Sequence, residues 1–214
     1  MSGALQVTFM NQRSFIPPLP AAIGAAFGGG FFAGQISTAG NGIADYNLVV
    51  GPVASAQNTS KQWKTSNTTT AGTTSVIDGP ANSSTMNNAS HPAAQFCEGL
   101  TIGGFTDWYM PAKNELEVCY YNLKPTTTTN NTNSGTNTNA VPSRGSNYTA
   151  GTPAQTSAAD FQSTGAEDFA ANFYWSSTED SATNAWIHYF GSGTQAGDPK
   201  NGSYSVRAVR RVAV

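Results

Sequence analysis

The sequence is poor in charge. Only 10% of its 214 residues are Asp, Glu, Lys or Arg, against about 25% in a typical soluble domain. The net charge is −2, so the chain offers no basic surface for DNA or RNA and no polybasic segment for an anionic membrane. Nucleic acid is therefore not expected as a partner. The polarity comes instead from the hydroxyls and amides of Thr, Ser and Asn.

Cysteine is equally scarce. Cys97 and Cys119 are the two cysteines of the chain, too few for the disulfide framework of a small secreted domain, and their spacing matches no zinc pattern. We expect both thiols to be buried structural groups. A disulfide between them is the alternative prediction if they lie on facing helices.

No segment has the pattern of a transmembrane helix. The mostly apolar run at residues 15–34 has about the length of a membrane span, but three prolines and three consecutive glycines oppose a helix there. A signal peptide would begin with a basic region, whereas the early charge here is the single Arg13. We therefore predict that residues 1–45 form an extended N-terminal arm ending in a first strand, FFAGQIS. Such an apolar arm needs a covering surface, and we expect another chain to supply it.

Residues 46–214 are predicted to form one α+β domain. Apolar spacing and capping signals indicate helices at 90–99 and 112–124, the second carrying Leu116, Cys119, Tyr120 and Leu123 on one stripe. Residues 66–88 and a Thr/Asn-rich surface insertion at 125–150 are predicted as loops, the insertion flexible at 126–139. Strands are predicted at the following ranges, the last three forming one antiparallel sheet: 46–53, 61–65, 173–179, 184–190 and 204–214.

Recognisable catalytic constellations are missing. Neither His91, expected to cap a helix or to lie on the surface, nor His188, in a strand among aromatic residues, forms a dyad with a cysteine. The neighbouring acids Glu167/Asp168 and Glu179/Asp180 would point to opposite faces of an extended chain and make no two-carboxylate site. No phosphate loop and no acidic calcium loop is present. We expect a protein without enzymatic activity, cofactor or metal.

Several ordered segments carry a family likeness. The segment AAQFCEGLTIGGFTDWYMPAKNELEVCY, then YWSSTE, then YSVRAVRRV near the end, resembles the C-type-lectin-like domains of phage tail and variable proteins and of the C-terminal parts of collagen-like bacterial adhesins. The resemblance covers residues 89–124 and 172–213. It implies two helices on a twisted antiparallel sheet, following the extended N-terminal arm. The calcium-ligand tripeptides of sugar-binding C-type lectins are missing, as is the reactive cysteine pair of the sulfatase-modifying enzymes that share the fold.

The resemblance also assigns roles to residues. Trp108, Trp175, Trp186 and Phe190 would be buried scaffold aromatics, and Gly193 would allow a turn. The positions that would face a ligand or receptor are Asn184, Ile187, His188, Tyr189, Ser192, Thr194, Gln195, Asp198, Asn201 and Tyr204. Strict alternation along the strand places His188 on the side of Trp186 and Phe190.

Three functions are weighed. The first is a bacteriophage virion protein, either a receptor-binding tail fibre or a head decoration, assembled in the host cytoplasm. It would join other virion proteins through the arm, form a homo-oligomer and bind a host cell-surface receptor, protein or glycan. The second is a bacterial surface adhesin for a glycan or matrix polymer, for which no secretion signal is recognised. The third, a polysaccharide hydrolase, lacks an acid and base pair. We also expect Glu179 to pair with Arg207 or Arg210 inside the sheet layer.

Overall fold

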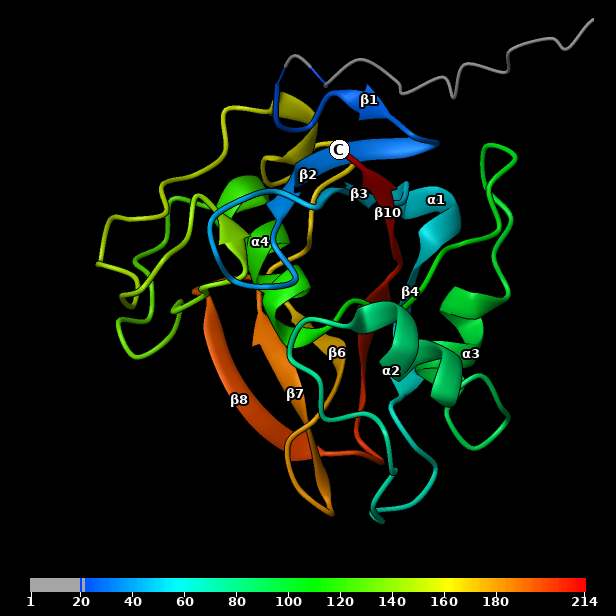
Figure 1. Cartoon of the computed structure of the whole chain (residues 1–214). Coiled ribbons are helices and arrows are strands. Elements are labelled where there is room, and N and C mark those ends of the chain that lie inside the picture. Colours follow the sequence, from blue (N-terminus) through cyan, green and yellow to red (C-terminus); the bar gives the residue numbers. More distant parts are fainter. Residues whose placement is uncertain (1–19, 21) are drawn as a thin grey trace, which may run out of the picture.

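Residue 20 and residues 22–214 are described by the structure, a computed structural model. The first part of the expected arm, residues 1–19 and 21, lies outside the described residues, and with it much of the surface predicted to contact another chain. The described part contains two five-stranded sheets, four α-helices and one short 3-10 helix (Figure 1). The prediction of an α+β protein is therefore confirmed.

The first sheet has the order β1-β2-β3-β10, with β5 pairing to β2. Its strands are β1 (Ala26–Phe27), β2 (Gly30–Ile36), β3 (Tyr46–Val50), β5 (Ala140–Val141) and β10 (Val209–Ala213). The predicted first strand is confirmed as β2. Residues 30–34 are not part of an extended arm that another chain must cover, because β2 is an interior strand whose Ala33 and Ile36 are fully buried. At Gly30 a Cβ would lie 2.3 Å from the carbonyl oxygen of Val50, so a side chain there would push β2 off β3.

The second sheet has the order β4-β9-β6-β7-β8. Its strands are β4 (Gln57–Gln62), β6 (Phe173–Glu179), β7 (Asn184–Tyr189), β8 (Thr194–Pro199) and β9 (Ser203–Arg207). The predicted closing strand 204–214 is wrong as one element, because it divides at Ala208 into β9 and β10, which belong to different sheets. Ala208 donates its N–H to the carbonyl of Ala56 rather than to a strand of either sheet. The prediction of one wholly antiparallel sheet is also wrong, since β9 runs parallel to β6.

Helix α4 (Lys113–Leu123) lies between the sheets and packs against β2 on one side and β6 and β7 on the other (Figure 1). Its predicted apolar stripe is confirmed as buried, and the carboxylate of Glu115 accepts the N–H of Ala112 to close the first turn. Helix α3 (Pro92–Glu98) also matches its prediction and packs against β4 and β9. Helix α1 (Val53–Ala56) is a single turn before β4.

Helix α2 (Gly79–Thr85) corrects the prediction of a continuous loop at 66–88. Its buried face is polar: Asn82 donates to the carbonyl of Ser75, and the hydroxyl of Ser83 accepts the N–H of Met110. Because these contacts replace apolar packing, α2 carries no apolar periodicity that could reveal it.

The cysteines occupy two separate cores. Cys97 packs with Trp108 and Trp175 around α3, and Cys119 packs with Tyr174 and Phe190 around α4. Both are buried and free, so the expected burial is confirmed and no disulfide joins them. Among the described residues, no helix has the length and apolar character needed to cross a membrane.

The predicted partner of Glu179 is wrong. Its carboxylate pairs with Lys200, while Arg207 pairs with Glu167 and Arg210 with Asp107. The reason is the division of the closing strand at Ala208: Arg207 points toward the loop carrying Glu167, and Arg210 lies in the other sheet.

Candidate binding surfaces

Three half-buried aromatic rings lie together on the outer face of the second sheet. Phe173 is opposite Tyr189 in the β6–β7 register, and its ring centroid is 4.8 Å from that of Tyr189 and 5.5 Å from that of Tyr204 on β9. The fully buried Trp175 supports the ring of Tyr204 at 5.0 Å. We call Phe173, Tyr189 and Tyr204 the aromatic patch. It unites two of the residues that the resemblance assigned to binding with one that it did not.

Some of the predicted binding residues share the face of the aromatic patch. Thr194 lies opposite Tyr189 in the β7–β8 register, and Asp198 lies opposite Ala185. The phenol of Tyr204 donates to Asp198 Oδ1 at 3.0 Å. Ile187 is on the same face but is buried beneath these side chains. Aromatic area, a carboxylate and a hydroxyl are thus held together on paired strands.

Other predicted binding residues point elsewhere. His188 is wrong as a surface residue: it faces α4, and its ring packs against those of Tyr120 and Phe190. Strand alternation also turns Asn184 and Gln195 to this opposite face, and Gln195 Oε1 accepts the N–H of Gly135. The strand does not bulge at His188, so simple alternation decides its place.

Two predicted residues lie beyond the strands. Ser192 is in the β7–β8 turn, where Gly193 adopts the expected left-handed conformation with φ of 76°. Asn201 is exposed and is held by its backbone to Gln62 and Asn67. They flank the aromatic patch at opposite ends of β8.

The predicted scaffold aromatics are buried with one exception. Trp108, Trp175 and Phe190 are at most 1% exposed, as expected. Trp186 is only half-buried. Alternation places it on the same sheet face as His188 but nearer the start of β7, and the ammonium group of Lys113 lies 3.4 Å from its ring centroid.

The Thr/Asn-rich segment is not the flexible loop that its composition predicted. Asn130, Ser134, Asn137 and Asn139 are buried in it, and their side chains hydrogen-bond to the domain. Composition alone excluded a buried core for this segment, but polar side chains can be buried when each finds a partner.

The segment is organised around the carboxylate of Glu117 on α4. This carboxylate accepts hydrogen bonds from Asn137, from the phenol of Tyr148 and from the guanidinium of Arg144. Burial raises the pKa of Glu117, and the charge of Arg144 and the hydrogen bonds act in the opposite direction. We call Glu117 with its three partners the Glu117 hub; it fixes the segment on the outer side of α4.

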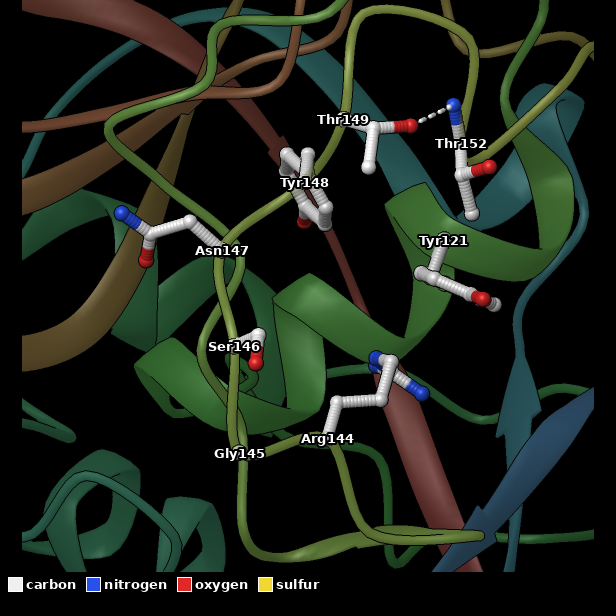
Figure 2. A pocket seen from close by; sticks show the side chains of 8 residues that line it. All are labelled: Tyr121, Arg144, Gly145, Ser146, Asn147, Tyr148, Thr149 and Thr152. Atoms are coloured by element: carbon white, nitrogen blue, oxygen red, sulfur yellow. Dashed lines mark hydrogen bonds between the residues drawn. The ribbon is translucent and has the colours of Figure 1, made fainter.

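A groove borders the Glu117 hub (Figure 2). One hollow of about 270 Å³ lies between Tyr121 of α4 and the segment 144–149, with Thr152 at its end. A second hollow of about 350 Å³ is lined by Tyr121, Thr152 and the segment 151–157, together with Ile23 and Asn122. We call the two hollows the Tyr121 groove. Most of its lining comes from residues 144–157, which follow the part of the insertion predicted to be flexible, and no signal in the sequence pointed to it.

The groups with catalytic potential are enclosed. Burial raises the pKa of both cysteine thiols. Burial, with the nearby charges of Lys64 and Lys200, lowers the pKa of His91 to about 4, and its ring bonds Thr70 and Asn88 instead of capping α3. In the part of the chain that the structure describes, no three His, Cys, Asp or Glu side chains gather as a metal site.

The chain is similar to known proteins in sequence and in structure. A family described as "Lcl C-terminal domain" matches residues 53–210. Among solved structures, a fimbrial protein from Bacteroides ovatus ATCC 8483 is similar over 76% of this chain and 35% of its own, with 17% identity and a TM-score of 0.39. The chain thus spans about a third of that protein. A comparison with curated proteins gives no match.

Proposed function

The chain belongs to the Lcl C-terminal domain family, and from this premise we propose that it is a non-enzymatic attachment module that binds a cell-surface receptor through the aromatic patch. The observation that carries the proposal is the clustering of the rings of Phe173, Tyr189 and Tyr204 on a face that the rest of the domain leaves half-exposed. Aromatic rings on paired strands offer a large contact area with little side-chain entropy to lose.

The sheet keeps this surface rigid. Tyr204 is fixed between Trp175 and the carboxylate of Asp198, and Tyr189 rests on Phe173. Interfaces of this kind depend on a few central aromatic contacts surrounded by polar groups, here Thr194 and Asp198. The receptor, protein or glycan, is accordingly bound without rearrangement of the fold.

We propose that this attachment module is part of a bacteriophage virion, where it serves as a tail fibre or a head decoration. The chain would assemble as a homo-oligomer and join the other virion proteins through its N-terminal segment. Support comes from the resemblance of residues 89–124 and 172–213 to phage tail and variable proteins, which also supports a C-type-lectin-like placement of the fold. The same resemblance extends to collagen-like bacterial adhesins, and a bacterial surface adhesin is the alternative carrier.

Cell binding tests the proposal. The fluorescently labelled full chain is added to a panel of intact bacteria and to cultured animal cells with their matrix. Saturable binding to bacteria supports the virion, and binding to animal cells or matrix supports the adhesin. The double variant Tyr189→Ala/Tyr204→Ala should lose about 30-fold or more in affinity, since each central aromatic contact contributes roughly 2 kcal/mol.

The thermal unfolding of the double variant is the matched control, because Trp175 loses its cover when Tyr204 is removed. A folded double variant that binds as well as the parent chain rejects the aromatic patch as the binding surface. A parent chain that binds none of these surfaces rejects the attachment function itself.

A further inference from the structure

The Tyr121 groove is a recessed surface built from other residues than the aromatic patch. Its two hollows share Tyr121 and Thr152. Both are lined by Tyr121 of α4 and by residues of the segment 144–157. We propose that this groove binds a short neutral saccharide of about two units, one in each hollow.

The ring of Tyr121 supplies the apolar element of the groove. The guanidinium of Arg144 lies 3.9 Å from the ring centroid and covers one face of the ring. The ring also lines the second hollow, where we expect it to contact the ligand. A lining that combines an aromatic ring with hydroxyl and amide groups suits a ligand ring that is polar at its rim and apolar on its faces, as a pyranose is.

Hydroxyl and amide groups also line the two hollows, among them those of Ser146, Asn147, Thr149, Thr152, Gln155 and Ser157. They lie beside the apolar residues Ile23, Pro153 and Ala154 of the second hollow. The side-chain nitrogens of Asn122 and Gln155 donate to the carbonyls of Ala33 and Pro125, which fixes both amides in place. A purely apolar ligand would strip water from these groups without replacing its hydrogen bonds. A ligand with many hydroxyls replaces them.

Charge argues for a neutral ligand. Arg144 is the one charged side chain among the residues lining the two hollows, and its guanidinium is paired with the fully buried carboxylate of Glu117. The pair carries no net charge, so the groove has no surplus cation for a sulfated or otherwise polyanionic chain.

The groove is fixed before any ligand arrives. Tyr148 is held by Glu117, and the N–H of Thr152 donates to Thr149 Oγ1 at 3.0 Å, as Figure 2 shows. Asn130 lies beneath the same turn and donates to the carbonyls of Thr149 and Pro153. A site whose walls are already ordered loses little entropy on binding.

Nuclear magnetic resonance of the ¹⁵N-labelled full chain tests the proposal. The probes are maltose, cellobiose and lactose at tens of millimolar, with a sulfated disaccharide and N-acetyl-triglycine amide as comparison ligands. We expect at least one neutral disaccharide to shift the amide signals of Tyr121, Thr149 and Thr152. Saturation of the Tyr121 ring protons should then transfer to the sugar protons.

Variants separate the Tyr121 groove from the aromatic patch. Tyr121→Ala should weaken saccharide binding about tenfold or more, and Tyr121→Phe, which keeps the ring, by less than about threefold. The double variant Tyr189→Ala/Tyr204→Ala is the matched control and should bind the saccharide as the parent chain does, so this test stands apart from the test of cell attachment.

Three results would overturn the proposal. One is the absence of any shift at the Tyr121 groove with all three neutral disaccharides. Another is a groove that responds to the sulfated disaccharide or to the peptide in preference to them. The third is unchanged binding by Tyr121→Ala. If Tyr121→Ala does not fold, saturation transfer from the Tyr121 ring in the parent chain decides the question.

Discussion

The ammonium group of Lys200 donates to the carboxylate of Glu179 in a pair that solvent scarcely reaches. The Lys200 side chain is fully buried and that of Glu179 is 4% exposed. Lys200 also donates to the carbonyls of Thr68 and Ala182, and Glu179 accepts the N–H of Thr70. One ion pair therefore ties the loop after β4 to the β6–β7 turn.

Glu179→Gln should destabilise the fold strongly. The substitution keeps the shape of the side chain but leaves the buried ammonium of Lys200 without a counter-charge, which costs about 3–5 kcal/mol. Urea unfolding measures the difference. Asp107→Asn is the matched control, because Asp107 is half-exposed and its pair with Arg210 contributes about 1 kcal/mol or less. Equal losses in the two variants would contradict this account.

The elements that the sequence predicted are those specified by their own residues. An apolar stripe and the prolines Pro111 and Pro125 at its two ends predict helix α4. Runs of aromatic and β-branched residues predict β6 and β7. The α+β class follows from these local patterns. The burial of Trp175 and Phe190 is instead what the family resemblance implies.

What the sequence did not reveal depends on contacts between distant residues. Asn137 looks like a loop residue, and its burial depends on Glu117, twenty positions earlier in the chain. The crossing from one sheet to the other at Ala208 is equally hidden, because no proline or glycine interrupts residues 204–214. The Tyr121 groove depends on the contacts that Glu117 makes with the Thr/Asn-rich segment, so it could not be found from local patterns.

The Glu117 hub should control the order of the Thr/Asn-rich segment. Glu117→Gln removes the negative charge that Arg144 pairs with, and Glu117 is fully buried, so we expect a loss of about 3 kcal/mol or more in the free energy of unfolding. Hydrogen exchange should show faster exchange at Asn137 and Tyr148 before the sheets open. Protection of these amides equal to that of the parent chain would mean that the segment is held in place by other contacts.

Gln195 separates the two faces of β8. Its side-chain Oε1 accepts the N–H of Gly135, and its backbone N–H donates to Ser134 Oγ. Neither group contributes to the aromatic patch. Gln195→Ala should leave receptor binding within about twofold of the parent chain while exchange at Gly135 becomes faster. Loss of binding in Gln195→Ala together with normal binding in Tyr189→Ala/Tyr204→Ala would place the receptor on the α4 side of the sheet.

His188 is a buried polar group without partners. Both of its ring nitrogens are buried and make no hydrogen bond to the described residues. Burial, with a smaller effect from the charge of Lys113, lowers the pKa of His188 from its ordinary 6.5 to about 3. The folded chain therefore holds His188 neutral at a pH where the unfolded chain protonates it.

This difference makes the fold sensitive to acid, and the sign follows from proton binding. Below pH 6.5 the unfolded chain takes up a proton at His188 that the folded chain does not bind until about pH 3. Stability is thus complete above pH 6.5 and falls by about 1.4 kcal/mol per pH unit on acidification through that window. His188→Phe removes the titrating group and keeps an aromatic ring against Tyr120 and Phe190. Urea unfolding at pH 7.5 and pH 5 should show that the parent chain loses about 2 kcal/mol more than the variant. An identical pH dependence in both chains would show that His188 is not the source of the acid sensitivity.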